Sequence, residues 1–309
     1  MHLFNLRSNI VIAALLLLMM AVLVLSAWVE DDAYITFRTI DNFIKTSGDL
    51  TGDAPNPWSV ADLGDFNDDG RSDILWRNPS TNAVAIWMMD GTVNLSSGLL
   101  SAVGGEWVVK AVADFDGDGM VDILWYNPTN GTALIWQMNG YTKLYSQSVG
   151  APPTAWQIVG VGDFNGDDRA DIVWHNGSTG TAVVWQINFV GGLYVKEAAL
   201  TIGAPPTAWR IQGIADFNGG GQPDILWRNT GNFNVAIWQM NGYVQESTGL
   251  IGTVGLNWDV ARLGDYNGGG QGDILWRNPS TGANVIWEMN GLAKMGAHSV
   301  GTVFGWSVQ

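Results

Sequence analysis

Cysteine is absent from the 309 residues, so the chain has no disulfide framework, no thiolate metal site and no cysteine nucleophile. Charged residues are also scarce, at 14% against about 25% in an ordinary globular chain. The 14 basic residues are outnumbered by 29 acidic ones, and the net charge of −15 argues against a nucleic-acid partner, because phosphate binding needs clustered Lys and Arg. The acidic excess leaves two explanations: a solvated acidic surface, or carboxylates gathered to hold cations.

Glycine and tryptophan are abundant instead, with 40 and 17 residues. Fifteen of the tryptophans fall into three series that share the same spacings of 49, 49, 53 and 49 residues. These series are Trp58, Trp107, Trp156, Trp209 and Trp258; Trp76, Trp125, Trp174, Trp227 and Trp276; and Trp87, Trp136, Trp185, Trp238 and Trp287. The four extra residues of the third repeat lie around Phe189 to Gly192 and should lengthen one loop. The chain therefore contains five tandem repeats of about 50 residues.

Each repeat has the same order of short apolar runs separated by turn residues. A run such as WSVADLGDF leads into a Gly/Asp turn, then DILWRN, a second turn, AVAIWMM and a weaker closing strand. Four antiparallel strands in about 50 residues are typical of one propeller blade, and stacked blades bury the faces that a single blade leaves open. We predict an all-β, five-bladed β-propeller over residues 58–309, with large Trp side chains buried between blades. Some of these indoles could instead form sugar-stacking platforms on a blade edge.

The sequence does not determine how many blades the closed ring contains. The segment GTVFGWSVQ, which begins at residue 301, matches the opening of a further repeat. It either closes a five-bladed ring by pairing with the first blade, or marks the chain as a fragment of a larger ring.

An apolar run from Ile10 to Ala27 precedes the repeats, with Arg7 before it and an acidic cluster after it. Its length exceeds a usual signal-peptide core and approaches the roughly 20 residues needed to span a bilayer. A positive charge before the apolar run and negative charges after it favour a cytoplasmic N-terminus, with the rest of the chain exported. We expect one N-terminal hydrophobic helix before the propeller, with residues 1–29 as a signal peptide or membrane anchor and residues 30–57 as a linker. The propeller is then extracytoplasmic, with membrane contact only through the N-terminal segment.

The first turn of every repeat follows the template D-x-[ND]-x-x-x-x-x-D. Oxygen ligands at loop positions 1, 3 and 5, with a glycine near position 6, are how EF-hand loops wrap calcium, and position 7 supplies only a carbonyl. In these loops the acid at position 9 completes the coordination shell of the predicted cation. Asx turns could explain one or two Asp in a loop, but not four at alternating positions. The predicted Ca²⁺ ligands are Asp65, Asn67, Asp69, Arg71 and Asp73 in loop 1; Asp114, Asp116, Asp118, Met120 and Asp122 in loop 2; and Asp163, Asn165, Asp167, Arg169 and Asp171 in loop 3.

The last two loops lack the position-5 acid, which a glycine replaces in both. Their remaining candidate ligands are Asp216, Asn218 and Asp224 in loop 4, and Asp265, Asn267 and Asp273 in loop 5. Calcium affinity rises with the charge and number of ligands, so we expect loops 4 and 5 to be weak or vacant metal loops and loop 2 to bind most tightly.

Nothing in the sequence marks a catalytic site. The motifs of nucleophile elbows, phosphate loops and H-E-x-x-H zinc enzymes do not occur. Of the three histidines, His175 occupies a repeat position where the other repeats have Arg77, Tyr126, Arg228 and Arg277. A glycosidase carboxylate pair stays open, because only the distance between two carboxyl groups would reveal it. We expect a protein that is not an enzyme.

The segments DFNDDGRSDILWRN and DFDGDGMVDILWYN resemble FG-GAP or VCBS-type repeats, and the resemblance covers residues 58 to about 303. Known examples are calcium-binding propellers, including the head domain of integrin α chains and some fungal lectins. The resemblance implies adhesion, with a glycan or a cell-surface protein as the partner. Two functions follow: a binding module for glycans or proteins, or a structural or accessory domain of an envelope enzyme without a ligand of its own.

A second resemblance covers residues 15–45. The stretch EDDAYITFRTIDNFI is similar to the segment after the first membrane helix of multi-spanning glycosyltransferases that use lipid-linked sugars. The acidic pair of that family corresponds to Asp31 and Asp32. Because no second membrane span is present to build such an enzyme, we interpret this segment as a borrowed leader.

Overall fold

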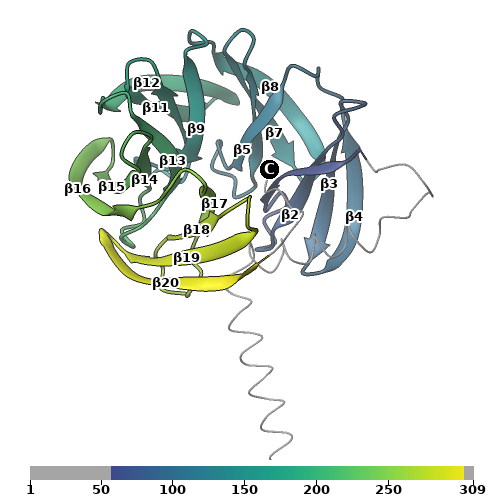
Figure 1. The fold of residues 1–309 in the computed structure, drawn as a ribbon. Coiled ribbons are helices and arrows are strands. Elements are labelled where there is room, and N and C mark those ends of the chain that lie inside the picture. The colour runs from purple at the N-terminus through teal and green to yellow at the C-terminus, as the bar shows by residue number, and fades with distance from the viewer. Residues whose placement is uncertain (1–56, 303–309) are drawn as a thin grey trace, which may run out of the picture.

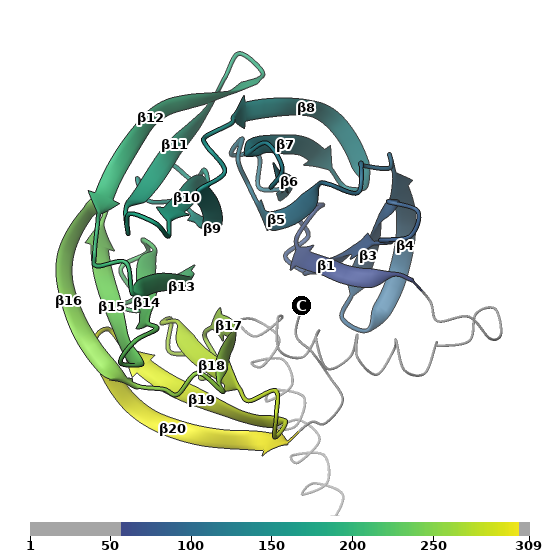
Figure 2. The same ribbon diagram turned by 45° about the horizontal axis from the view of Figure 1, so that its top comes forward.

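The computed structural model describes residues 57–302, which form twenty strands in five four-stranded antiparallel sheets (Figures 1 and 2). Blade 1 contains β1 (Ser59–Gly64), β2 (Asp73–Arg77), β3 (Val84–Asp90) and β4 (Val93–Leu100). Blade 2 contains β5 (Val108–Ala113), β6 (Asp122–Asn127), β7 (Thr132–Asn139) and β8 (Thr142–Gly150). Blade 3 contains β9 (Trp156–Gly162), β10 (Asp171–Asn176), β11 (Ala182–Val190) and β12 (Leu193–Gly203). Blade 4 contains β13 (Trp209–Ala215), β14 (Asp224–Asn229), β15 (Asn234–Asn241) and β16 (Val244–Thr253). Blade 5 contains β17 (Asp259–Gly264), β18 (Asp273–Arg277), β19 (Ala283–Asn290) and β20 (Ala293–Thr302).

The five sheets stand around a common axis, with β1, β5, β9, β13 and β17 innermost and β4, β8, β12, β16 and β20 at the rim (Figure 2). This arrangement confirms the predicted all-β propeller of five four-stranded repeats. The N-terminal apolar run, the linker up to residue 56 and most of the sixth-repeat segment lie outside the described residues. Within residues 57–302 the structure contains no helix, and therefore no helix able to cross a membrane.

The second strand of each blade is the most deeply buried, because it lies inside the sheet and has a neighbouring blade on each face. In β2, Ile74 and Leu75 are almost fully enclosed, and all six residues of β6, β10 and β14 are buried. This explains why DILWRN has a continuous apolar run rather than an alternating one.

The apolar cores lie between the blades. One cluster joins blades 1 and 2, and separate clusters join blades 2 and 3, 3 and 4, and 4 and 5. In each blade the tryptophan of the second strand packs at a tilt against that of the third, with ring centroids between 4.7 and 5.3 Å apart. All fifteen repeat tryptophans fall within the described residues, and none of them is exposed. They are the wedges between blades that the spacing predicted.

Blades 5 and 1 face each other across the remaining junction of the ring. Burial raises the pKa of Asp62 in β1, and the positive charge of Arg262 in β17 opposes that rise. Asp62 also accepts the backbone N–H of Val112 in blade 2, at 3.2 Å. One carboxylate of the inner strand therefore interacts with both neighbouring blades.

The four extra residues of the third repeat lengthen strands rather than a loop. Strands β11 and β12 contain 9 and 11 residues and are joined by a tight turn at Gly191 and Gly192. Both glycines have positive φ, of 63° and 83°, so the hairpin turns at once and the insertion continues the ladder. The expectation of a longer loop was wrong, because Phe189 and Tyr194 pair across the strands.

Candidate metal loops

Each predicted metal loop joins the first and second strands of its blade. Because the strands alternate in direction, these loops lie at the same end of the propeller as the hairpins between the third and fourth strands. Position 1 is Asp65, Asp114, Asp163, Asp216 or Asp265, and position 9 is the first residue of the second strand. All five acid-bearing loops are thereby gathered on one face.

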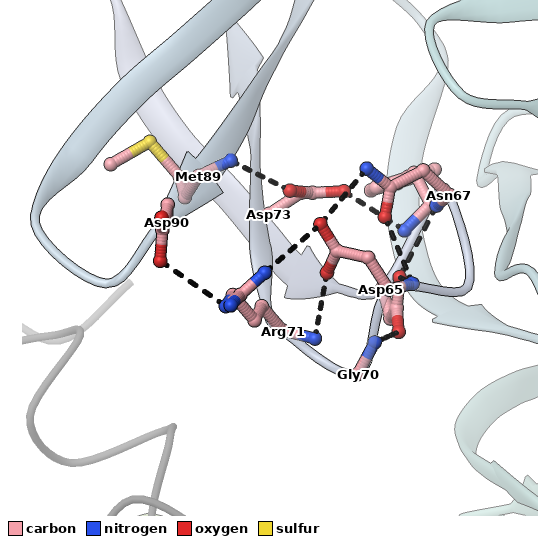
Figure 3. A network of polar contacts seen from close by, with 9 residues as sticks. Asp65, Asn67, Gly70, Arg71, Asp73, Met89 and Asp90 are labelled. Atoms are coloured by element: carbon pink, nitrogen blue, oxygen red, sulfur yellow. Dashed lines mark hydrogen bonds and ion pairs between the residues drawn. The ribbon is translucent and has the colours of Figure 1, made fainter.

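The position-1 carboxylate organises the loop backbone. In loop 1, Asp65 accepts the backbone N–H groups of Asn67 and Asp69 on Oδ1, both at 3.2 Å, and that of Gly70 on Oδ2 at 2.7 Å (Figure 3). The equivalent bonds to position 6 occur in the other four loops at 2.6 to 2.8 Å. The position-1 carboxylate therefore makes the Asx-type bonds to backbone N–H groups that the sequence suggested, and it does so in all five loops.

The position-9 carboxylate is buried and ties the loop to the third strand. Asp73, with no exposed surface, accepts the N–H of Phe66 at 3.1 Å and that of Met89 at 2.8 Å (Figure 3). Asp122 makes the same pair of bonds to Phe115 and Met138. Position 9 thus has a structural role in every blade, a role that the ligand template did not indicate.

Burial raises the pKa of each position-9 acid. The pKa rises to about 6 for Asp73, Asp171 and Asp224, and to about 7 for Asp122, while that of Asp273 is also raised. Desolvation is the main cause in all five, and the other carboxylates of the loop add to it, whereas backbone N–H donors oppose it. A bound cation would favour the ionised form of these acids.

Loop 2 brings its acids closest together. The carboxylates of Asp114, Asp116 and Asp122 offer oxygens that all lie within 4.8 Å of one another, the one such acidic group in residues 57–302. Asp118, at position 5, lies outside this group and accepts the N–H of Met120 at 2.9 Å. Gln137 of β7 donates to Asp116 at 2.5 Å, and sequence reasoning missed this contact.

Loops 1 and 3 replace the position-3 acid by an amide. Asn67 donates to Asp69 at 3.2 Å, and Asn165 donates to Asp167 at 3.0 Å, so positions 3 and 5 are adjacent in both loops. Arg71, at position 7, has its N–H bonded to Asp69 and its guanidinium 3.2 Å from Asp90.

In loops 4 and 5, as in loops 1 and 3, the position-3 amide oxygen accepts the N–H of position 5. Asn218 accepts the N–H of Gly220, and Asn267 accepts that of Gly269, each at 2.7 Å. Asn267 also donates to Glu288 of β19 at 3.0 Å, a carboxylate that the loop template could not include. These two loops fold with the same backbone as the others and present fewer acids.

Positions 4 and 6 adopt the left-handed conformation in all five loops. Glycine occupies eight of these ten places, and the exceptions are Asp68 at 57° and Asp168 at 63°. Left-handed backbone at both places explains the Gly-rich sequence of the loops. It also explains why Gly219–Gly221 and Gly268–Gly270 keep the loop shape.

Neighbouring loops are linked by backbone hydrogen bonds. The carbonyl of Asp65 accepts the N–H of Val121 at 2.9 Å. In the same way, the carbonyl of Asp114 accepts the N–H of Ala170 at 2.7 Å, and the carbonyl of Asp216 accepts the N–H of Gly272 at 2.6 Å. The equivalent donor toward Asp163 is absent, because Pro223 occupies that position in blade 4 and has no N–H.

The donor set fits a hard divalent cation. Loops 1 to 3 offer carboxylate and amide oxygens in a short, glycine-containing loop, with no nitrogen or sulfur ligand among the candidates, and such sets favour Ca²⁺ over zinc or copper. In loop 2 three of these oxygen donors already converge. The residues therefore suit calcium by the chemistry of their side chains.

The family comparison matches two overlapping segments, residues 65–125 and 114–174, to an FG-GAP-like repeat. No curated protein matches the chain.

Among solved structures, the nidogen/laminin complex is similar, with a TM-score of 0.50 at 10% identity, covering 79% of this chain and 81% of that one. The Photorhabdus luminescens Tc holotoxin pore has a TM-score of 0.49 at 16% identity, covering 82% of this chain and 12% of that one. Streptogramin B lyase has a TM-score of 0.47 at 7% identity, covering 80% and 70%. At these identities the likenesses concern the fold alone. The chain is a five-bladed β-propeller that contains FG-GAP-like repeats.

Proposed function

We propose that this propeller is a calcium-binding module in which loops 1, 2 and 3 hold Ca²⁺ and loops 4 and 5 bind weakly or stay empty. The observation that carries the proposal is the convergence of Asp114, Asp116 and Asp122 within 4.8 Å. Three carboxylates at that separation repel one another, and a divalent cation between them removes the repulsion. Loops 1 and 3 repeat the pattern with one amide in place of an acid.

Calorimetric titration of the EDTA-stripped protein with CaCl₂ tests this proposal. We expect about three ions per chain, and a higher melting temperature with calcium by mass action. The double substitution Asp116→Asn with Asp118→Gly gives loop 2 the donor set of loops 4 and 5 and should remove the tightest site, while Asn218→Ala in loop 4 should leave the count unchanged. A count of zero, or five equal sites, would contradict the proposal.

The module is proposed to be non-enzymatic and to bind a glycan or a cell-surface protein. Two cavities support this. One, of about 340 Å³, is lined by Trp209, Trp227, Trp238 and Thr248 of blade 4, and the other, of about 370 Å³, includes Asn67 and Tyr141. The blade-4 cavity combines indole rings with a threonine hydroxyl, which suits sugar rings because these have an apolar face and peripheral hydroxyls. The other cavity has no indole and combines a tyrosine ring with amide and hydroxyl groups.

A glycan array, read with calcium and with EDTA, tests the binding function. Ala236→Leu provides a matched variant, because Ala236 lines the blade-4 cavity and blade 2 has Leu134 at the equivalent place. Loss of binding in this variant would locate the ligand, whereas failure of the folded, calcium-loaded wild-type protein on glycans and on envelope extracts would favour the alternative function.

That alternative is a structural or accessory domain of an envelope enzyme, with no ligand of its own. It is supported by the resemblance of residues 15–45 to a glycosyltransferase leader. In both cases we propose an extracytoplasmic location, based on the apolar run from Ile10 to Ala27 and its flanking charges. A reporter active only after export, fused behind Gln309, should be active, and a signal confined to the cytoplasm would contradict this location.

A further inference from the structure

We propose that Tyr194 of blade 3 is a positioning residue for the metal loop of blade 2, so that this site is completed across the interface between the two blades. The inference rests on the proposed calcium binding by that loop. Tyr194 lies in β12, 72 residues after the acid that it contacts. No feature of the loop template includes it.

The tyrosine hydroxyl reaches the buried acid of the loop directly. Its Oη donates to Oδ2 of Asp122 at 2.9 Å, and Tyr194 is itself 2% exposed. Asp122 also accepts the N–H of Phe115 and that of Met138. Three donors from three segments therefore fix the plane of this carboxylate, and with it the direction of the oxygen lone pairs that remain for a cation.

Tyr194 is held in place by blade 2 as well. Its N–H donates to the Gln147 side chain at 2.9 Å, and its carbonyl accepts from the same amide at 2.6 Å. The contact is thus a fixed part of the interface.

Blade 3 also contacts the other two acids of the group. The carbonyl of Asp114 accepts the N–H of Ala170, and the carbonyl of Asp116 accepts Nε of Arg169 at 3.2 Å. Each of the three residues whose carboxylates converge in loop 2 is therefore bonded from the next blade. The site is an interface structure rather than a property of one loop.

The other blades provide an internal comparison. Tyr243 of blade 4 makes the same bond to Asp171 of loop 3, at 2.9 Å. Tyr141 of blade 2 is 43% exposed and lies instead against blade 1, where a Cβ on Gly98 would come within 2.5 Å of its ring. Blade 5 has Leu292, which has no hydroxyl, at the corresponding hairpin position. Loops 2 and 3 are completed by a tyrosine, and loops 1 and 4 are not.

Hydrogen-bond partners of metal ligands orient them, and their loss typically lowers metal affinity by about 10–100-fold. We expect Tyr194→Phe to weaken one of the calcium sites about 10-fold and to leave the number of sites unchanged. Tyr243→Phe should weaken a different site. The affinity order should be loop 2, then loop 3, then loop 1, although loops 1 and 3 have the same acids.

The test is calcium titration of the full EDTA-stripped chain, wild type and variants, by calorimetry. Tyr126→Phe is the matched control, because its hydroxyl crosses the same blade 2–3 interface but donates to the carbonyl of Trp156 at 3.0 Å. That variant should lower the metal-free melting temperature and keep every calcium affinity. In a background with Asp116→Asn and Asp118→Gly, in which loop 2 has the donor set of loops 4 and 5, Tyr194→Phe should no longer change calcium binding.

The outcomes separate the two proposals. If the wild type binds no calcium, the proposed function fails. If the wild type binds calcium and Tyr194→Phe binds it with the same affinities, the role of Tyr194 is wrong. Equal affinity losses in Tyr194→Phe and Tyr126→Phe would also overturn it, since they would reflect a general loosening of the interface. Should Tyr194→Phe fail to fold, Tyr243→Phe tests the same relationship at loop 3.

Discussion

The guanidinium of Arg228 lies over the ring of Trp276 in the next blade, with Cζ 5.5 Å from the ring centroid. The same relationship joins Arg77 to Trp125, and in edge-on form Tyr126 to Trp174 and His175 to Trp227. The fifth position of the second strand therefore fastens each of blades 1 to 4 to the next blade. A cation over an indole contributes about 0.5–2 kcal/mol, depending on desolvation.

We expect Arg228→Met to destabilise the protein by about 3 kcal/mol. Arg228 donates to the carbonyls of Trp258 and Val254, at 2.6 and 2.8 Å, and these bonds are lost with the charge. Urea unfolding in EDTA measures the change. Arg71→Gln is the control, since Arg71 forms an exposed ion pair with Asp90 that contributes about 0–1 kcal/mol. Equal effects of the two substitutions would contradict the fastening role.

His175 should make stability depend on pH. Burial, and next the charge of Arg210, lower the pKa of His175 below its unfolded value of 6.5. A base with a lowered folded pKa contributes stability that is complete above the unfolded value and is lost as the pH falls through the folded value.

The variant His175→Tyr takes the residue that blade 2 has at this position. We expect the wild type to lose stability relative to this variant as the pH falls from about 7 to about 5, with a constant difference above 7. Melting temperatures in EDTA across this range provide the measurement. A difference that does not change with pH would show that the pKa of His175 is the same in the folded and the unfolded protein.

Asp224 should be structural rather than metal-binding. It is fully buried in the glycine-rich fourth loop and accepts the N–H groups of Phe217 and Met240, at 3.1 and 2.8 Å. Asp224→Ala leaves two buried donors without an acceptor, at about 1–3 kcal/mol each. We expect this loss in EDTA and in calcium alike. A loss seen only in calcium would place a metal in loop 4.

Asp168 is an aspartate in a left-handed position where four loops have glycine. We expect Asp168→Gly to stabilise the metal-free protein by roughly 0.5 kcal/mol, because relief of the backbone exceeds the entropy cost of glycine. The reverse change in loop 2, Gly119→Ala, should destabilise by about 1 kcal/mol or more, since φ is 87° and a Cβ would lie 3.1 Å from the Asp68 carboxylate. Chemical denaturation in EDTA distinguishes the two signs.

The strand order and the number of repeats were predictable because each repeat carries its own pattern. The spacing of Trp76 and Trp125 marks equivalent strands, and the apolar run before each marks burial on both faces. The loop template also located the acids that converge in the structure. These features are local in sequence, and local patterns are what a single sequence reveals.

Contacts between blades were not predictable in the same way. Tyr194 and Asp122 are 72 residues apart, and no spacing rule connects a rim strand to a loop of the preceding blade. His175 was interpreted only as a variable position, because its packing against Trp227 depends on how two blades meet. A possible signal was the insertion before Tyr194, which marks the third hairpin as different.

Pro223 interrupts the series of backbone hydrogen bonds that link neighbouring loops. Loops 1, 2 and 3 form one continuous backbone chain and loops 4 and 5 a second, and no N–H bridges them at Asp163. The boundary coincides with the change from acid-rich to glycine-rich loops. Under partial denaturation, calcium should therefore protect the three blades whose loops are linked to one another and bind the ion, and it should add little to the stability of blades 4 and 5.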